Sequence, residues 1–168
     1  NYGDMAYLTR LQQVNEAIID KWKQDVAEHP VVLRMKKYPH HGDTSCYKHC
    51  MRVAYFNYII CKKLHLDAKS AARAGMLHDL FLYDWHTHAR ETGERLHGFT
   101  HAEKAYKNAG KIFRLNRVER DVIRNHMWPV TLRSVPRTRE GWMIVLTDKY
   151  SGLLETLDRR KKNKKNCI

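Results

Sequence analysis

The sequence contains few of the residues that interrupt helices or cross-link extracellular domains. Of its 168 residues, 8 are glycine, 4 are proline and 4 are cysteine. Low glycine and proline content argues against a loop-rich or disordered chain and favours a helical one. The cysteines are irregularly spaced and do not indicate a disulfide framework. They are Cys46, Cys50, Cys61 and Cys167.

Long hydrophobic runs are also missing. No stretch approaches the roughly 18 consecutive apolar residues that a membrane-spanning helix needs. The first residues, NYGDMAYLTRLQQ, are mostly polar and do not resemble a secretion signal. We therefore expect a chain without a membrane span, located in a reducing cytoplasm.

Acidic residues are scarce relative to basic ones. The 18 Asp and Glu face 31 Lys and Arg, which gives a formal net charge of +13. Such a balance favours anionic partners, among them nucleotides, phosphorylated metabolites and nucleic acid. The oligomeric state cannot be inferred from these numbers.

Apolar residues recur at helical spacing along most of the chain, and no convincing strand pattern is present. The chain is long enough for one domain with a sizeable core. We predict a single-domain all-α bundle of about six helices around a central metal site. The predicted helices are 5–28, 44–65, 67–80, 100–115, 116–129 and 139–158. The predicted units are an N-terminal helix (1–37) that packs on the domain, the domain itself (38–158) and a basic tail (159–168).

Several helix starts have capping signals. Asp43 or Thr44 is expected to cap the second helix, and Asp67 the third. Thr100 with Glu103, and Asn116 with Glu119, have the spacing of capping boxes. His29–Pro30 is expected to end the first helix. The apolar residues of the last helix are predicted to face inward: Trp142, Val145, Leu146, Tyr150, Leu153, Leu154 and Leu157.

The stretch AGMLHDLFLYDW (74–85) places a His–Asp pair among apolar residues. A carboxylate in such surroundings is costly unless it is paired or binds a metal. Other candidate ligands occur on separate predicted helices. They are His49, His101, His126 and Asp148, in addition to His78 and Asp79. Because bundles build metal sites from facing helices, these residues could share one centre.

Imidazole and carboxylate ligands suit Mn, Fe, Co, Zn or Ni, as one ion or two, with Mg as a further candidate.

Several of these residues also have an explanation that involves no metal. His78 could be a buried histidine bonded to a carboxylate, His101 a solvent-facing histidine, and His126 one favoured by a helix C-terminus. Cys46 and Cys50 share a helix face with His49, so a zinc–thiolate site is conceivable. Without a second cysteine pair, small core residues are the preferred interpretation.

The ordered set resembles the HD-domain superfamily of metal-dependent phosphohydrolases. The family pattern is a His, a His–Asp doublet and a distant Asp, matched by His49 in TSCYKHCMRVA, His78–Asp79 in AARAGMLHDL and Asp148 in VLTDKYSGLLE. The resemblance covers roughly residues 40–158. Two-metal members add two histidines between the doublet and the last Asp, matched by His101 and His126. Three residues after Asp79, some nucleotidase-like members have Glu and some cyclic-dinucleotide phosphodiesterases have Lys, whereas this sequence has Leu82. The resemblance therefore implies the general phosphohydrolase activity rather than either specific one.

The resemblance implies hydrolysis of a phosphate ester by metal-activated water, whose pKa falls from about 16 toward 7 on a divalent ion. In the two-metal arrangement Asp79 bridges the ions. We name Arg52 and Lys149 as candidate substrate contacts, and Asp79 and Asp84 as catalytic candidates, with Asp84 a general base or substrate contact. A small phosphorylated molecule is the expected substrate, with a nucleotide favoured.

Two other functions stay open. The first is a non-enzymatic, metal-stabilised module that binds nucleic acid or another polyanion through its basic surface, including the tail RRKKNKK (159–165). The second is a di-iron oxygenase on an HD-like fold.

Among the other histidines, we expect His40 and His41 in a loop over the site. His86, His88 and His97 are expected to be exposed.

Overall fold

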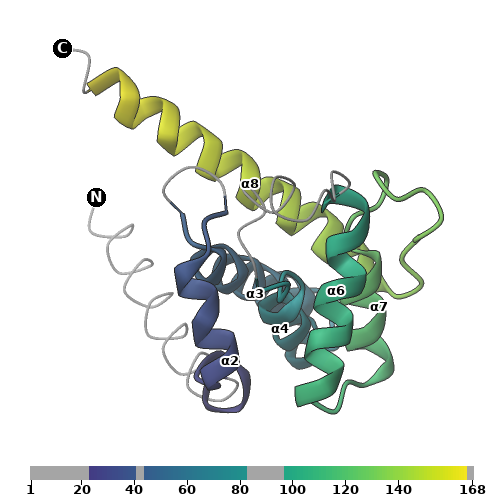
Figure 1. Ribbon diagram of the computed structural model, residues 1–168. Helices are drawn as coiled ribbons and strands as arrows, with labels where there is room; N and C mark the ends of the chain where they lie inside the picture. Colours follow the sequence, from purple (N-terminus) through teal and green to yellow (C-terminus); the bar gives the residue numbers. More distant parts are fainter. Residues whose placement is uncertain (1–22, 41–43, 83–96, 166–168) are drawn as a thin grey trace, which may run out of the picture.

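The computed structural model describes residues 23–40, 44–82 and 97–165 (Figure 1). Within these ranges the ordered elements are helical, apart from one isolated bridge between Pro39 and Ser45. The α-helices are α2 (Pro30–Leu33), α3 (Cys46–Lys63), α4 (Ala68–Leu77), α6 (His97–Ile112), α7 (Arg117–Asn125) and α8 (Arg139–Lys165). A π-helical turn (Lys23–Ala27) precedes α2, and a 3₁₀ turn (Arg34–Lys37) follows it. The predicted all-α class is confirmed.

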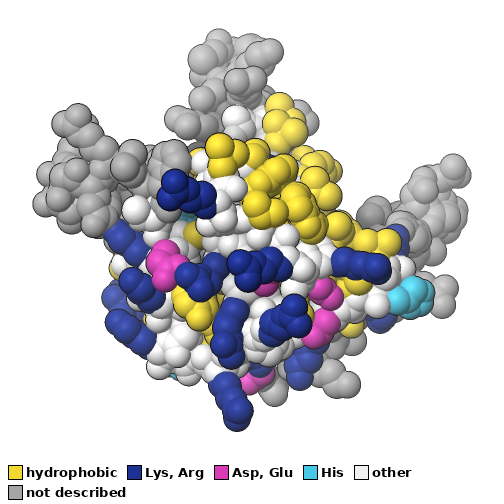
Figure 2. All heavy atoms as spheres, turned by 90° about the vertical axis from the view of Figure 1, so that its right-hand side faces the viewer, with side chains coloured by type: hydrophobic (Ala, Val, Ile, Leu, Met, Phe, Trp, Pro, Cys, Tyr) yellow, Lys and Arg dark blue, Asp and Glu magenta, His cyan; other side chains and the backbone are white. Residues whose placement is uncertain are grey.

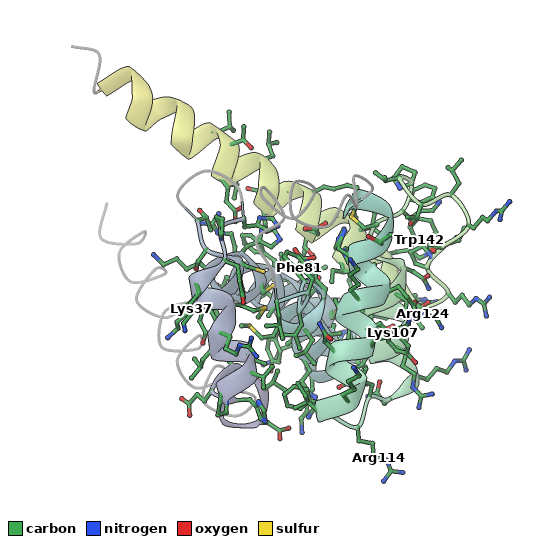
Figure 3. The ribbon with its side chains drawn as sticks, viewed as in Figure 1. Lys37, Phe81, Lys107, Arg114, Arg124 and Trp142 are labelled. Atoms are coloured by element: carbon green, nitrogen blue, oxygen red, sulfur yellow. The ribbon has the colours of Figure 1, made fainter. Side chains whose placement is uncertain are left out.

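The helices enclose one apolar core. Helix α3 packs on both α4 and α8, while α7 packs on α4, α6 and α8. Figure 1 shows α3 and α4 between α2 on one side and α6 with α7 on the other, and α8 projects beyond them. Phe81 lies in the interior among these helices (Figure 3) and is 4% exposed. None of the described helices is both long and apolar enough to cross a membrane.

Local sequence signals account for most helix starts. Asp67 caps α4 by accepting a hydrogen bond from Ser70 N, as predicted. Asn116 and Glu119 form the predicted capping box of α7. Helix α3, however, is capped by Ser45 rather than by Asp43 or Thr44. Capping satisfies backbone N–H groups that have no partner within the helix, so these side chains set where each helix begins.

Two predicted boundaries are wrong. Helix α6 begins at His97, so Thr100–Glu103 lies inside the helix and is not its capping box. Helix α7 ends at Asn125 rather than near Pro129. As predicted, the helical turn before His29–Pro30 ends, at Ala27, and His29 is extended. Pro30 then begins α2, where its missing N–H costs nothing. Most of the helix predicted at 5–28 lies outside the described residues.

The face that α8 buries also differs from the prediction. Val145 is buried, but Leu146 and Leu153 are 62% and 55% exposed, and Trp142, Tyr150 and Leu157 are exposed as well. The helix instead turns Thr147, Ser151 and Glu155 into the protein. It is apolar on more than one side, so hydrophobic periodicity alone does not decide which side faces α3. The tail predicted as a separate unit from 159 continues as helix to Lys165.

Gly75 marks the closest approach of α4 to α3. A Cβ built on Gly75 would lie 2.9 Å from Ala54 Cα and 3.2 Å from Asn57 Nδ2. Gly75→Ala is therefore expected to lower the free energy of unfolding by roughly 1–3 kcal/mol, because the two helices must separate. Urea unfolding measures this change.

Gly110→Ala in α6 is the matched control. Apart from its own helix, no described residue has an atom within 4 Å of the Cβ built on Gly110, so alanine is expected to raise stability by roughly 0.5–1 kcal/mol. Equal effects of the two substitutions would contradict the close packing of α3 on α4.

Candidate metal centre

The six predicted ligands converge in the centre of the protein from five separate segments. His49 comes from α3, His78 and Asp79 from the end of α4, His101 from α6, His126 from the end of α7 and Asp148 from α8. All four histidines and Asp79 are buried, and the Asp148 side chain is 16% exposed. The ligand roles predicted for these residues stay predictions, but the fold brings every one of them to the same place.

Asp79 divides its two oxygens between two groups of donors. Its Oδ2 lies 3.5 Å from His78 Nε2 and 4.0 Å from His49 Nε2. Its Oδ1 lies 3.4 Å from His101 Nε2 and 3.6 Å from His126 Nε2. A carboxylate placed in this way can contribute one oxygen to each of two neighbouring ions.

The first donor group is completed by Asp148. Its Oδ1 lies 3.0 Å from His49 Nε2 and 3.6 Å from His78 Nε2. Ligands that share one ion at about 2.0–2.2 Å lie roughly 3–4 Å apart, so these separations suit coordination of a single ion. In the second group His101 Nε2 lies 3.0 Å from His126 Nε2.

Two buried atoms test whether these residues fit a metal. His78 Nε2 and Asp79 Oδ1 have no hydrogen-bond partner within the described part of the chain. Leaving such atoms unpaired costs about 1–3 kcal/mol each. Both atoms point into the cluster, where a divalent ion would satisfy them, so the donor set fits a metal.

Backbone contacts fix which ring nitrogen faces the cluster. Nδ1 of His78 lies 2.7 Å from Gly75 O, and Nδ1 of His126 lies 2.8 Å from Ile123 O. An Nδ1–H that donates to a carbonyl leaves Nε2 as the lone-pair atom, which is the form that binds metals. Both residues follow directly after a helix, where free carbonyl groups are available for this contact.

The turn that carries Asp79 is held from several sides. Phe81 N donates to Asp79 O over 2.8 Å, and the thiol of Cys46 donates to the same carbonyl. Asn108 of α6 donates to Leu80 O over 2.8 Å. The Phe81 ring meets the edge of His101, and Leu82 takes a positive φ of 58° as the chain leaves the site. These contacts place the carboxylate independently of any ion.

Two further residues contact the cluster, although the sequence analysis does not include them in it. Glu155 of α8 has a fully buried side chain and lies 3.0 Å from His49 Nδ1. His40, expected in a loop over the site, is buried, with Nε2 3.1 Å from Asp79 Oδ2 and Nδ1 3.3 Å from Glu155. Its ring stacks on His49 at 3.7 Å. Glu155 and Asp148 are seven residues apart, two helical turns, and this spacing is the one signal that could have revealed Glu155.

The remaining predicted residues have different outcomes. Arg52 lies at the edge of the cluster, with Nη1 3.5 Å from Glu155 and a side chain that is 34% exposed. Lys149 donates to His126 O over 3.4 Å, and burial lowers its pKa. Asp84, His41, His86 and His88 lie outside the described residues, and the side chain of His97 is not described.

The cysteine alternative is disfavoured by electrostatics. Cys46 and Cys50 are both buried and lie close enough to Asp79 to form a possible ligand group. Burial, however, raises the pKa of Cys50 well above its usual value, so the neutral thiol is favoured over the thiolate that binds metals. This supports their interpretation as small core residues.

In the metal-free protein the cluster carries opposed charges. Burial alone would lower the pKa of His40 and His78, but neighbouring carboxylates raise it to about 10 and about 9. Burial alone would raise the pKa of Asp79, Asp148 and Glu155, but the histidines lower it, to about 2 for Glu155 and well below the usual range for the two aspartates. His40 and His78 are therefore protonated near neutral pH when no ion is present.

This predicts how the stability of the chelated protein depends on pH. The contribution of protonated His40 and His78 to the free energy of unfolding is complete below the pKa of an unfolded histidine, about 6.5. It disappears as pH rises through 9–10, the range of their pKa values in the folded protein. The carboxylate contribution is present above about pH 4 and disappears as pH falls toward 2. We expect the melting temperature in chelator to be highest near pH 5–6 and to fall by pH 9. A divalent ion should remove the alkaline fall, because it binds deprotonated imidazole. A melting temperature in chelator that stays constant from pH 6 to pH 9 would contradict this assignment of charges.

A family model agrees with this geometry. The model described as HD domain matches residues 46–153, which is more than half of the chain and includes all six predicted ligands. The chain belongs to the HD-domain family. The HD domain is all-α, binds divalent metals and characterises a superfamily of metal-dependent phosphohydrolases. No curated protein and no solved structure matches the sequence.

Proposed function

We propose that this HD-domain protein is a phosphohydrolase that cleaves the phosphate ester of a small molecule by means of two divalent ions. The observation that carries the proposal is the division of Asp79 between two donor groups. Asp79 Oδ1 and His78 Nε2 are buried and have no hydrogen-bond partner among the described residues. His49, His78, Asp148 and Asp79 Oδ2 would hold one ion. His101, His126 and Asp79 Oδ1 would hold the second.

A bound divalent ion supplies Lewis acidity toward water and toward a phosphoryl oxygen. The chain orients the site through Glu155, which fixes the His49 ring, and through the carbonyls of Gly75 and Ile123, which fix His78 and His126. Arg52 is partly exposed beside Glu155 and would place a guanidinium on a substrate phosphate. Lys149, beside His126, is a second candidate for that contact, and Asp84 is kept as a candidate general base.

A nucleotide is the favoured substrate. The support is the net charge of +13, together with basic side chains at the edge of the cluster. The identity of the ions is a choice among Mn, Fe, Co, Zn, Ni and Mg, because mixed imidazole and carboxylate ligands select weakly among them. We keep the cytoplasm as the proposed location.

We also propose that residues 38–158 form the hydrolase unit, with the segment 1–37 packed on it and a basic tail from 159. Val26, Val32 and Met35 from the first segment are fully buried in the core, which supports this packing.

The test is phosphate release from a panel of nucleotides and sugar phosphates, with each candidate metal and with chelator. Release that requires metal and is lost in chelator supports the proposal and identifies the substrate class. Bound iron with oxygen consumption and no phosphate release would favour the oxygenase alternative. Salt-sensitive oligonucleotide binding that survives loss of Asp79, without hydrolysis, would favour the binding module.

A further inference from the structure

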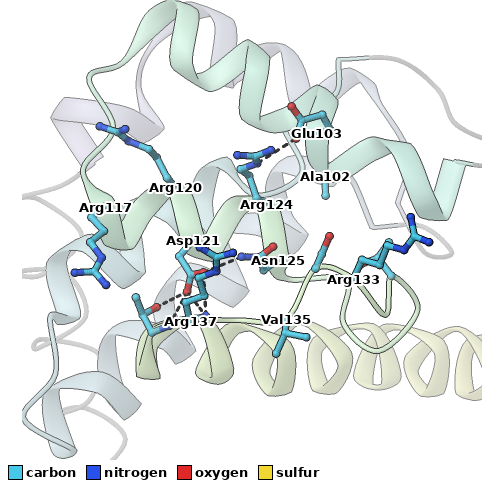
Figure 4. Close-up of a pocket in the computed structure, with 13 residues that line it drawn as sticks. Ala102, Glu103, Arg117, Arg120, Asp121, Arg124, Asn125, Arg133, Val135 and Arg137 are labelled. Carbon is cyan, nitrogen blue, oxygen red and sulfur yellow. Dashed lines mark hydrogen bonds and ion pairs between the residues drawn. The ribbon is translucent and has the colours of Figure 1, made fainter.

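A second cavity lies outside the metal centre, and its walls are rich in arginine. It has a volume of about 520 Å³ and is formed by α7, the start of α6 and the loop 131–138. Five arginines line it, together with two acidic residues (Figure 4). The arginines are Arg117, Arg120, Arg124, Arg133 and Arg137. None of the six predicted metal ligands lines this cavity.

The acidic residues of the cavity are already engaged by other groups. Asp121 is 9% exposed and accepts hydrogen bonds from Arg137 N, from Thr138 N and Oγ1, and from Asn125 Nδ2, at 2.6–3.0 Å. Figure 4 shows these bonds joining the loop to α7. Glu103 pairs with Arg124 at 3.2 Å. Asp121 therefore holds the walls of the cavity together by bonds that involve no arginine side chain.

Most of the arginine charge has no carboxylate partner. Among the described residues, no carboxylate pairs with the guanidinium of Arg117, Arg133 or Arg137, and Arg120 Nε donates to Leu115 O. Arg117, Arg120 and Arg124 follow one another at spacings of three and four, so they share a face of α7. Like charges on one helix face repel each other, and a bound anion would relieve this repulsion.

The surface around the cavity also carries many basic side chains. Figure 2 shows dark-blue Lys and Arg side chains spread over the face that includes α6 and α7. The cavity is lined by residues of these two helices. Its volume lies within the range of about 300–1,000 Å³ that is typical of small-molecule sites.

We propose that this cavity binds a small polyphosphate, either free or as the triphosphate group of a nucleotide. Guanidinium groups bind phosphate oxygens in pairs, and several of them around one cavity match a chain of linked phosphates better than a single phosphate. The site is separate from the metal centre and does not depend on the proposed hydrolytic activity. Helix α7 connects the two, because its arginine face lines the cavity and His126 follows its last residue.

The test is calorimetric titration of the full chain with inorganic triphosphate and with ATP, at low salt and without added divalent ions. We expect both to bind, and binding to weaken as salt is raised. Arg133→Gln with Arg137→Gln should lower the affinity at least about tenfold, because charged hydrogen bonds are lost while the Arg137 N–H bonds to Asp121 remain. Both side chains are exposed, so the variant should keep its fold.

Arg34→Gln with Arg114→Gln is the matched control. It removes the same charge from exposed side chains that do not line the cavity, and Figure 3 shows Arg114 pointing away from the body of the protein. We expect a clearly smaller loss than in the cavity variant, because neither side chain lines the cavity and neither can donate to an anion bound there. Absence of triphosphate and ATP binding, or equal losses in the two variants, would overturn the proposal. So would binding of an oligonucleotide through the same arginines when triphosphate and ATP do not bind.

Discussion

Asp79→Asn is expected to abolish metal-dependent phosphate release and to release the bound ions, while the helical fold remains. Asp79 is the one described carboxylate that faces both donor groups, with His78 Nε2 3.5 Å from one oxygen and His101 Nε2 3.4 Å from the other. A metal ion contributes several kcal/mol of charge stabilisation in the transition state, which corresponds to a loss of about a thousandfold or more in rate. Phosphate release and metal content measure the change.

The control is Asp25→Asn. The Asp25 side chain is 56% exposed and pairs with Arg73, and neither residue contacts a predicted ligand, so its loss should leave metal content and activity unchanged. Far-ultraviolet circular dichroism shows whether the Asp79 variant has kept its helices. A folded Asp79 variant that retained its metal would remove Asp79 from the ligand set.

Glu155→Gln is expected to lower the affinity for the metal about 10–100-fold without removing a ligand. The Glu155 carboxylate accepts from His49 Nδ1, and a neutral amide would orient that ring less strongly and make it less basic. Glu155 is therefore a positioning residue. Competition with a chromophoric chelator measures the affinity, and Glu28→Gln provides a matched change at an exposed position.

A purely structural role for Glu155 predicts something different. It would lower the melting temperature of the chelated protein and leave the metal affinity of the folded protein unchanged. Excess metal should restore the rate of the Glu155 variant if the lost affinity is the cause. No recovery at saturating metal, together with unchanged affinity, would contradict the positioning role.

The metal cluster could be predicted because several of its residues are charged or polar side chains within apolar stretches of the sequence. His78 and Asp79 lie in an apolar run, and Asp148 lies in another, where an unpaired charge is costly. Their order along the chain, together with His49, carries the resemblance to the HD family. The fold brings His49 and His78 each within 4.0 Å of both carboxylates.

Glu155 was not predicted, and His40 was expected over the site rather than within the cluster, for a physical reason. The inward face of α8 was predicted from hydrophobicity, which favours Leu146 and Leu153, whereas the protein buries Thr147, Ser151 and Glu155. A helix that supplies ligands to a polar centre must bury polar residues, and this reverses the usual hydrophobic rule. His40 precedes α3 and reaches the cluster only through tertiary packing.

The arginine cavity has no sequence motif. Its walls come from α6, from α7 and from the loop 131–138. Asp121 joins α7 to the loop by accepting backbone and side-chain bonds from Arg137 and Thr138. A buried carboxylate that fixes a loop in this way cannot be distinguished in the sequence from an ordinary exposed aspartate of a helix.

The most direct test of the metal centre is the elemental composition of the purified protein, measured with the Asp79→Asn variant beside it. The two donor groups predict a ratio approaching two divalent ions for each chain, and a loss of both in the variant. A parent protein that retains no divalent ion after incubation with each candidate metal and dialysis would contradict the central claim that these histidines and aspartates form a metal centre.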